Sequence, residues 1–185
     1  MLNYLGKRHA FLSYTSFHER RSLIRKPEIP KMMLSETPGA LKNFRRTPWK
    51  FQQTFQTPLK NLQRFVATIV SPSHNFTAGC LTIEQVVFEP KHLISLLTDY
   101  SISPRYGHDL SLTAVGQEEV EALLQAALSD WVDFIFIPQP KPFVIYADHD
   151  EYTTFYAHTC SNLNRVAEAL SGQGFKTISG YERQL

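Results

Sequence analysis

The chain has 185 residues, of which 43% are hydrophobic and 19% are charged, and this balance excludes a disordered chain and indicates a globular protein. Its net charge of +2 conceals a division, because residues 1–64 carry 13 Lys and Arg against three Glu, whereas the rest carries six against 14 Asp and Glu. No apolar run approaches the length of about 18 residues that a membrane-spanning helix needs, and no secretory signal is visible, so we expect a cytoplasmic protein without a membrane span.

The charge division predicts two parts. Residues 1–64 read as a basic N-terminal extension that is interrupted by prolines, in which residues 1–31 are either disordered or not native. Residues 65–185 read as an acidic α+β domain. A basic extension can bind nucleic acid, bind an anionic membrane surface, or lie on the acidic face of its own domain.

The first half of the acidic domain shows two β-type segments and two helical patterns. β-branched and aromatic residues favour strands, and apolar residues three or four apart favour helices. Thr113 is the expected N-cap of the second helix, which follows an irregular loop. In chain order, the sequence predicts strands over 65–70 and 80–88, a helix over 91–100, a loop over 101–112, and a helix ending near residue 128.

The second half predicts three strands on short connections, which favours an antiparallel meander. A helix that Ser161 caps and a closing strand follow it. The segments are strands over 131–137, 143–147 and 152–157, a helix over 161–171, and a strand over 175–181. We therefore expect an α+β fold, with an antiparallel sheet of about five or six strands and helices packed on one face, preceded by an irregular basic arm.

One polar cluster separates two apolar strands. Asp148, His149, Asp150 and Glu151 place four titratable side chains in consecutive positions. Carboxylate oxygens and imidazole nitrogens are metal ligands, so Asp148, His149 and Asp150 are candidate ligands, and all four are candidate groups of a metal-dependent hydrolase. The alternative is a polar hairpin turn in which the Asp side chains accept hydrogen bonds from their own backbone.

Aromatic side chains supply the second group of candidates. Tyr146, Tyr152 and Tyr156 cluster in the meander, and tyrosine is favoured where an apolar surface meets water in a protein interface. In the basic arm, Trp49 follows Arg45 and Arg46, and arginine beside aromatic rings can hold a single nucleic-acid strand.

Motifs for nucleotide or dinucleotide binding and for common hydrolases are missing from the sequence, so it predicts no cofactor. We expect a non-catalytic interaction or accessory protein that binds a protein partner or a second copy of itself. The alternatives are the metal-dependent hydrolase and nucleic-acid binding through the basic arm.

Overall fold

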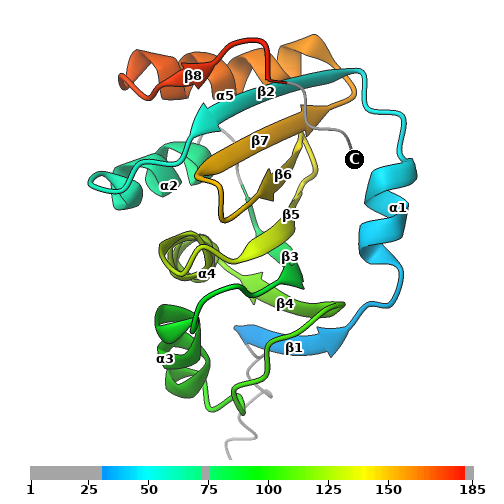
Figure 1. The fold of residues 1–185 in the computed structure, drawn as a ribbon, viewed down its shortest axis with the longest axis vertical. Helices are drawn as coiled ribbons and strands as arrows, with labels where there is room; N and C mark the ends of the chain where they lie inside the picture. Colours follow the sequence, from blue (N-terminus) through cyan, green and yellow to red (C-terminus); the bar gives the residue numbers. More distant parts are fainter. Residues whose placement is uncertain (1–30, 72–75, 182–185) are drawn as a thin grey trace, which may run out of the picture.

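The computed structural model describes residues 31–71 and 76–181 (Figure 1). Strands and helices alternate through the first two thirds, and a three-stranded meander then precedes the last helix. In chain order, the elements are β1 (Met32–Glu36), α1 (Ala40–Arg46), β2 (Phe51–Gln56), α2 (Leu62–Val70), β3 (Ala78–Gln85), α3 (Lys91–Asp99), β4 (Leu110–Val115), α4 (Gln117–Ser129), β5 (Asp133–Gln139), β6 (Val144–Ala147), β7 (Tyr152–Ala157), α5 (Cys160–Gly172) and β8 (Thr177–Ile178).

Within the described residues, all strands belong to one antiparallel sheet of eight, in the order β1-β4-β3-β5-β6-β7-β2-β8. The predicted α+β class and antiparallel sheet are confirmed, but eight strands exceed the expected five or six. The meander is also confirmed, as β5, β6 and β7. The two outer positions belong to β1 at one margin and to the two-residue β8 at the other.

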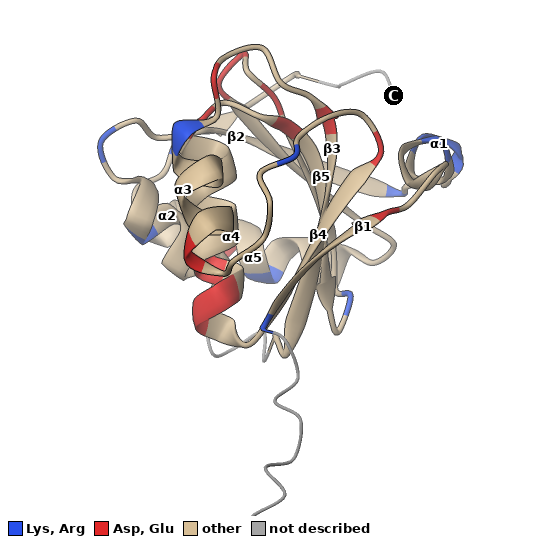
Figure 2. Cartoon of the chain, turned by 90° about the horizontal axis from the view of Figure 1, so that it is seen from below, with Lys and Arg blue, Asp and Glu red and all other residues tan. Residues whose placement is uncertain are grey.

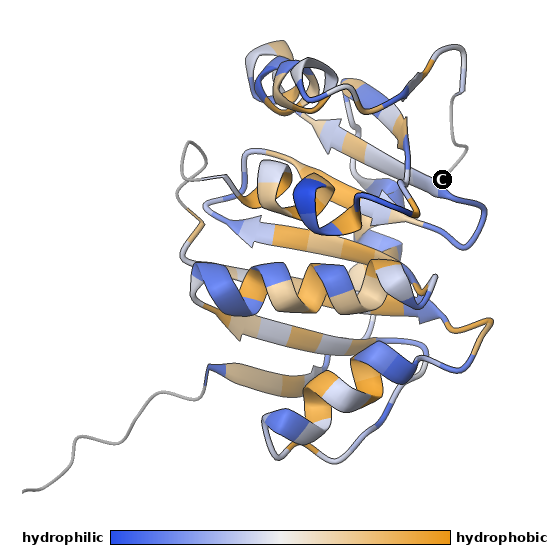
Figure 3. Cartoon of the chain, turned by 90° about the vertical axis from the view of Figure 1, so that its left-hand side faces the viewer, coloured by the Kyte–Doolittle hydropathy of each residue, from blue (hydrophilic) through white to orange (hydrophobic). Residues whose placement is uncertain are grey.

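The main core lies between the sheet and four helices, α2, α3, α4 and α5, which cover one face (Figure 3). Alternate residues of each strand point into this layer, as the pleat of a strand requires. Full burial of one large apolar side chain contributes roughly 1.5–3 kcal/mol, so the aromatic rings dominate this core. Its buried rings include Phe55, Phe65, Phe134, Phe136, Phe143 and Phe155.

The opposite face of the sheet is covered in part by α1, which lies across the strands (Figure 1). Leu41 and Phe44, three positions apart on α1, are buried there against the sheet. The expectation that all helices pack on one face is therefore wrong. A seven-residue helix between two prolines has too few residues for its apolar period to stand out in the sequence.

The part of the expected irregular arm that the structure describes, residues 31–64, contributes β1, α1, β2 and the start of α2. β1 pairs with β4, and β2 is inserted between β7 and β8. Pro38, Pro48 and Pro58 lie before α1, before β2 and after β2, so these prolines separate short elements and do not prevent them. The prediction for residues 1–30 lies outside the described residues.

Three local predictions are wrong. Residues 65–70, expected as a strand, belong to α2, because a short run rich in β-branched residues also satisfies the helical spacing through Phe65, Val66 and Ile69. The end of the expected loop over 101–112 and Thr113, the expected N-cap, belong to β4, and Gly116 precedes α4. Thr159, and not Ser161, caps α5, since its side chain accepts from the Asn162 N–H. The closing strand is shorter than expected, since only Thr177 and Ile178 pair with β2.

The insertion of β2 in the sheet gives a direct test of this fold. Phe55 is fully buried, whereas Phe51 on the same strand is 37% exposed. We expect Phe55→Ala to lower the free energy of unfolding by about 3–5 kcal/mol, and Phe51→Ala, the matched control, to lower it by less than about half as much. Urea denaturation measures both, and equal costs for the two substitutions would mean that β2 is not part of the core.

Candidate functional site

Acidic residues gather on the loops at one end of the sheet, at the top of Figure 2. Strand pairing explains the arrangement, because β3 ends where β5 begins, and β6 ends where β7 begins. The carboxylates at this end include Glu84, Glu89, Asp109, Asp130, Asp133, Asp148, Asp150 and Glu151. The turn between β6 and β7, which holds the four candidate residues 148–151, is in the middle of this acidic end.

Asp148 supports the backbone of its own turn. Its side chain is buried, and Oδ1 accepts hydrogen bonds from the backbone N–H groups of Asp150 and Tyr152, both at 3.1 Å. A buried carboxylate that accepts backbone N–H bonds stabilises a turn. This geometry supports the alternative that the sequence left open, a polar hairpin turn.

His149 is held by Asp133, the first residue of β5. Asp133 is buried, and its Oδ1 accepts from the backbone N–H of His149 at 2.7 Å and lies 2.8 Å from the Nδ1 atom of the ring. This hydrogen bond to Asp133 raises the pKa of His149 above its ordinary value, against the opposing effect of burial. The imidazole keeps its Nε2 edge toward the outside, where the carboxylate of Asp150 lies at 3.9 Å.

Asp133 was not predicted as a site residue. Its signal in the sequence is a single carboxylate inside the apolar run from Trp131 to Ile137. A charge is rarely buried in a strand unless another group compensates it, so such a residue predicts a polar partner from elsewhere in the chain. The partner itself is determined by strand pairing, which the run does not reveal.

The remaining two candidate residues diverge. The Asp150 side chain is 74% exposed, whereas Glu151 turns toward β2, where its Oε2 lies 3.4 Å from the Nε2 of Gln56. Among the described residues, no group of three or more His, Cys, Asp or Glu side chains is placed to hold a metal ion. The arrangement brings together one pair, His149 and Asp133, in which the aspartate orients a histidine as in many acid–base catalysts.

Tyr146 and Arg45 meet on Glu84, near the end of β3. The Tyr146 hydroxyl donates to Glu84 Oε2 at 2.6 Å, and the Arg45 guanidinium forms an ion pair with Glu84 Oε1. Tyr146 is buried, and Glu84 is mostly buried. These contacts fasten α1 to β3 and β6, so both predicted binding residues have structural roles.

Trp49 and Tyr156 belong to the cluster beneath α1. The Trp49 ring stacks on His158 at a centroid distance of 4.8 Å, packs against Phe44 and Tyr156, and lies 5.4 Å from the Lys141 ammonium group. Burial raises the pKa of the Tyr156 hydroxyl, which has no hydrogen-bond partner among the described groups. These contacts occupy part of the Trp49 ring surface that the predicted stacking of a nucleic-acid base would need.

The other two predicted binding residues lie apart from this cluster. Arg46 is exposed at the end of α1. Tyr152 is the first residue of β7, which follows the acidic turn, and its ring packs against that of Tyr181 at a centroid distance of 4.7 Å. The six predicted binding residues therefore do not form one surface.

Comparisons with known proteins return nothing to which this chain is similar: no family model, no curated protein and no solved structure matches it. In the ranges 31–71 and 76–181, no helix has the length and apolar character needed to cross a membrane.

The pair of His149 and Asp133 predicts a specific titration. Because Asp133 raises the folded-state pKa of His149 above about 6.5, the pair stabilises the fold below that pH, and this contribution is lost as the pH rises through the folded-state pKa. We expect Asp133→Asn to lower the pKa of His149 in an NMR titration of its ring. Asp150→Asn, the control at a more distant and exposed carboxylate, should change it less. An unchanged pKa in Asp133→Asn would contradict the assigned pair.

Proposed function

We propose that this chain is a non-catalytic protein-interaction protein and that the edge strand β1 is its interface with a second copy. The observation that carries the proposal is the position of β1, which lies at the margin of the sheet and has β4 as its one strand neighbour among the described elements. An exposed edge strand is a template for pairing with another strand.

The hydrogen bonds at both ends of β1 identify its outward groups. The Lys31 carbonyl accepts from Val115 at 2.8 Å, and the Thr37 N–H donates to Asp109 at 3.1 Å, so the odd-numbered residues direct their backbone groups toward β4. The even-numbered residues Met32, Leu34 and Glu36 consequently direct theirs away from the sheet. This pattern provides three N–H and three C=O groups for a further strand.

β1 lacks the devices that usually protect a sheet edge. Its five residues, Met-Met-Leu-Ser-Glu, include no proline, no lysine and no bulge. Met33 adds a large apolar side chain that is 40% exposed. The strand is therefore suited to pairing.

Symmetry favours a second copy as the occupant, because the outward backbone groups of β1 can pair with the same groups of another β1 strand. Antiparallel pairing centred on Leu34 places Leu34 opposite its own equivalent and Met32 of each copy opposite the exposed Glu36 of the other. The same arrangement sets Met33 of each copy opposite Ser35 of the other, on the face of the sheet that α1 covers only in part.

The residues of the acidic turn support the non-catalytic part of the proposal. Asp148 is engaged with the backbone, and Asp150 and Glu151 point apart. The pair of His149 and Asp133 belongs to no group of three or more His, Cys, Asp or Glu side chains placed to hold a metal ion among the described residues. The Cys160 thiol, at the start of α5 beyond the far end of β7, donates to Asn164 Oδ1 at 3.4 Å.

Sedimentation analysis of the full chain tests the interface. We expect a concentration-dependent dimer that Leu34→Pro and Glu36→Lys weaken by at least about tenfold. Proline at position 34 removes an N–H that points away from β4, so the fold should tolerate it. Glu36→Lys places a lysine on the edge strand, opposite Met32 of the other copy, and a lysine on an edge strand discourages pairing.

Two controls separate the interface from general effects. Leu34→Ala keeps the outward N–H and should retain the dimer, and Glu168→Lys makes the same charge change on an exposed part of α5. A monomer at every concentration would overturn the proposal, as would variants at positions 34 and 36 that dimerise like the unaltered chain.

A further inference from the structure

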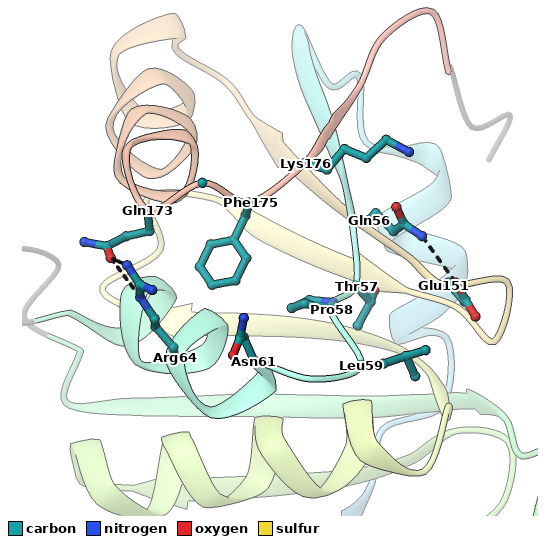
Figure 4. Close-up of a pocket in the computed structure, with 11 residues that line it drawn as sticks. Gln56, Thr57, Pro58, Leu59, Asn61, Arg64, Glu151, Gln173, Phe175 and Lys176 are labelled. Carbon is teal, nitrogen blue, oxygen red and sulfur yellow. Dashed lines mark hydrogen bonds between the residues drawn. The ribbon is translucent and has the colours of Figure 1, made fainter.

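A cavity of about 260 Å³ opens near the opposite margin of the sheet, where the segment after β2 faces the end of α5 (Figure 4). Its walls come from the β2–α2 connection, the first turn of α2, the β6–β7 turn and the segment leading to β8. Polar side chains dominate the lining, with Asn61, Arg64, Glu151 and Lys176 among them. The cavity is separate from β1, which lies at the opposite margin of the sheet.

Two cations in the lining have no carboxylate partner. The Arg64 guanidinium donates through Nε and Nη2 to Oε1 of Gln173, a neutral amide, with the Nε contact at 2.9 Å. Neither Arg64 nor Lys176 takes part in an ion pair within the described residues. The lining thus carries two cations and one carboxylate, that of Glu151, although the surrounding domain is acidic.

The remaining lining adds an acceptor and a rigid apolar wall. Glu151 accepts one long contact from Gln56, at 3.4 Å, which leaves acceptor positions on its carboxylate. Phe175 lies between the Arg64 and Lys176 sides of the cavity (Figure 4) and packs edge-to-face on Phe65 at a centroid distance of 5.0 Å. The Asn61 side chain points toward this ring and makes no capping hydrogen bond.

We propose that this cavity binds a small polar molecule whose oxyanion, a carboxylate or a phosphate, is held by Arg64, and whose hydrogen-bond donor faces Glu151, with Lys176 adding positive charge from the other side of Phe175. Arginine is suited to bidentate recognition of such oxyanions, and lysine adds a second, point-like charge. At about 30 Å³ for each water-sized volume, the cavity accommodates on the order of nine non-hydrogen atoms. This is the size of an amino acid or a phosphorylated fragment and smaller than the usual drug-sized site.

NMR titration of the full chain with inorganic phosphate, L-glutamate and glucose tests the site. At constant ionic strength, phosphate, glutamate or both should shift the amide signals of residues 56–64 and 173–176, and glucose should not. A response to phosphate alone assigns the oxyanion to a phosphate, and a response to glutamate alone assigns it to a carboxylate. No response to either molecule at millimolar concentration would overturn the proposal.

Charge-removing variants locate the binding. Arg64→Gln and Lys176→Gln alter exposed side chains. Arg64→Gln should weaken binding about tenfold or more, because a hydrogen bond to a charged group is lost, and Lys176→Gln, which removes a more distant charge, should weaken it less. Arg165→Gln, which removes an exposed arginine of α5 outside the cavity, should leave binding unchanged. Glu151→Gln should weaken glutamate binding, whose ammonium group faces the carboxylate, more than phosphate binding. Equal affinities in all four variants would show that the oxyanion binds elsewhere.

Discussion

A wide antiparallel sheet exposes two faces to water, and the arrangement of this chain depends on covering both. The four helices that follow strands β2, β3, β4 and β7 bury one face completely. Among the described helices, α1 is the one that covers the centre of the other face, because the connection from β1 to β2 must cross from one margin of the sheet to a position near the other. That crossing places the aromatic rings of Phe44 and Trp49 over Tyr146 and Tyr156, and the ion pair of Arg45 with Glu84 fixes it at the far side. Four of the six residues that looked suited to binding a partner therefore hold α1 and its flanking segment on the sheet: Arg45, Trp49, Tyr146 and Tyr156.

At the acidic end of the sheet, too, side chains that looked suited to a site are used to hold the fold together. Three buried carboxylates there accept hydrogen bonds from backbone N–H groups: Asp130 from His92 and Leu93, Asp133 from His149, and Asp148 from Asp150 and Tyr152. Buried carboxylates are stable only with such partners, and each here fixes the start of a helix or a turn. The two sites that we propose for binding lie elsewhere, on the outward backbone groups of β1 and at the cavity near β8.

The sequence predicted the elements whose pattern is local and long. The meander from residue 131 to 157, the helix beginning near Cys160 and the strand around Leu81 each show a clear period, and the structure has them close to their expected bounds. Elements that depend on distant contacts were missed. β2 has the polar strand sequence Phe-Gln-Gln-Thr-Phe-Gln, and it is a strand because β7 and β8 flank it. The sequence also did not predict that Asp133 is the partner of His149, or that Arg64 and Lys176 line one cavity. Residues this far apart in the chain are brought together by the order of strands in the sheet, which no single segment encodes.

If β1 is an open edge that a second copy closes, hydrogen exchange of its outward amides should depend on protein concentration. The amides of Met33 and Ser35 face β4 and should exchange slowly at every protein concentration. The amides of Met32, Leu34 and Glu36 face outward, and we expect them to become protected from exchange as the protein concentration rises. Outward amides that exchange rapidly at all concentrations would contradict the pairing of two copies. Outward amides that remain protected in dilute solution would mean that the chain itself covers the edge.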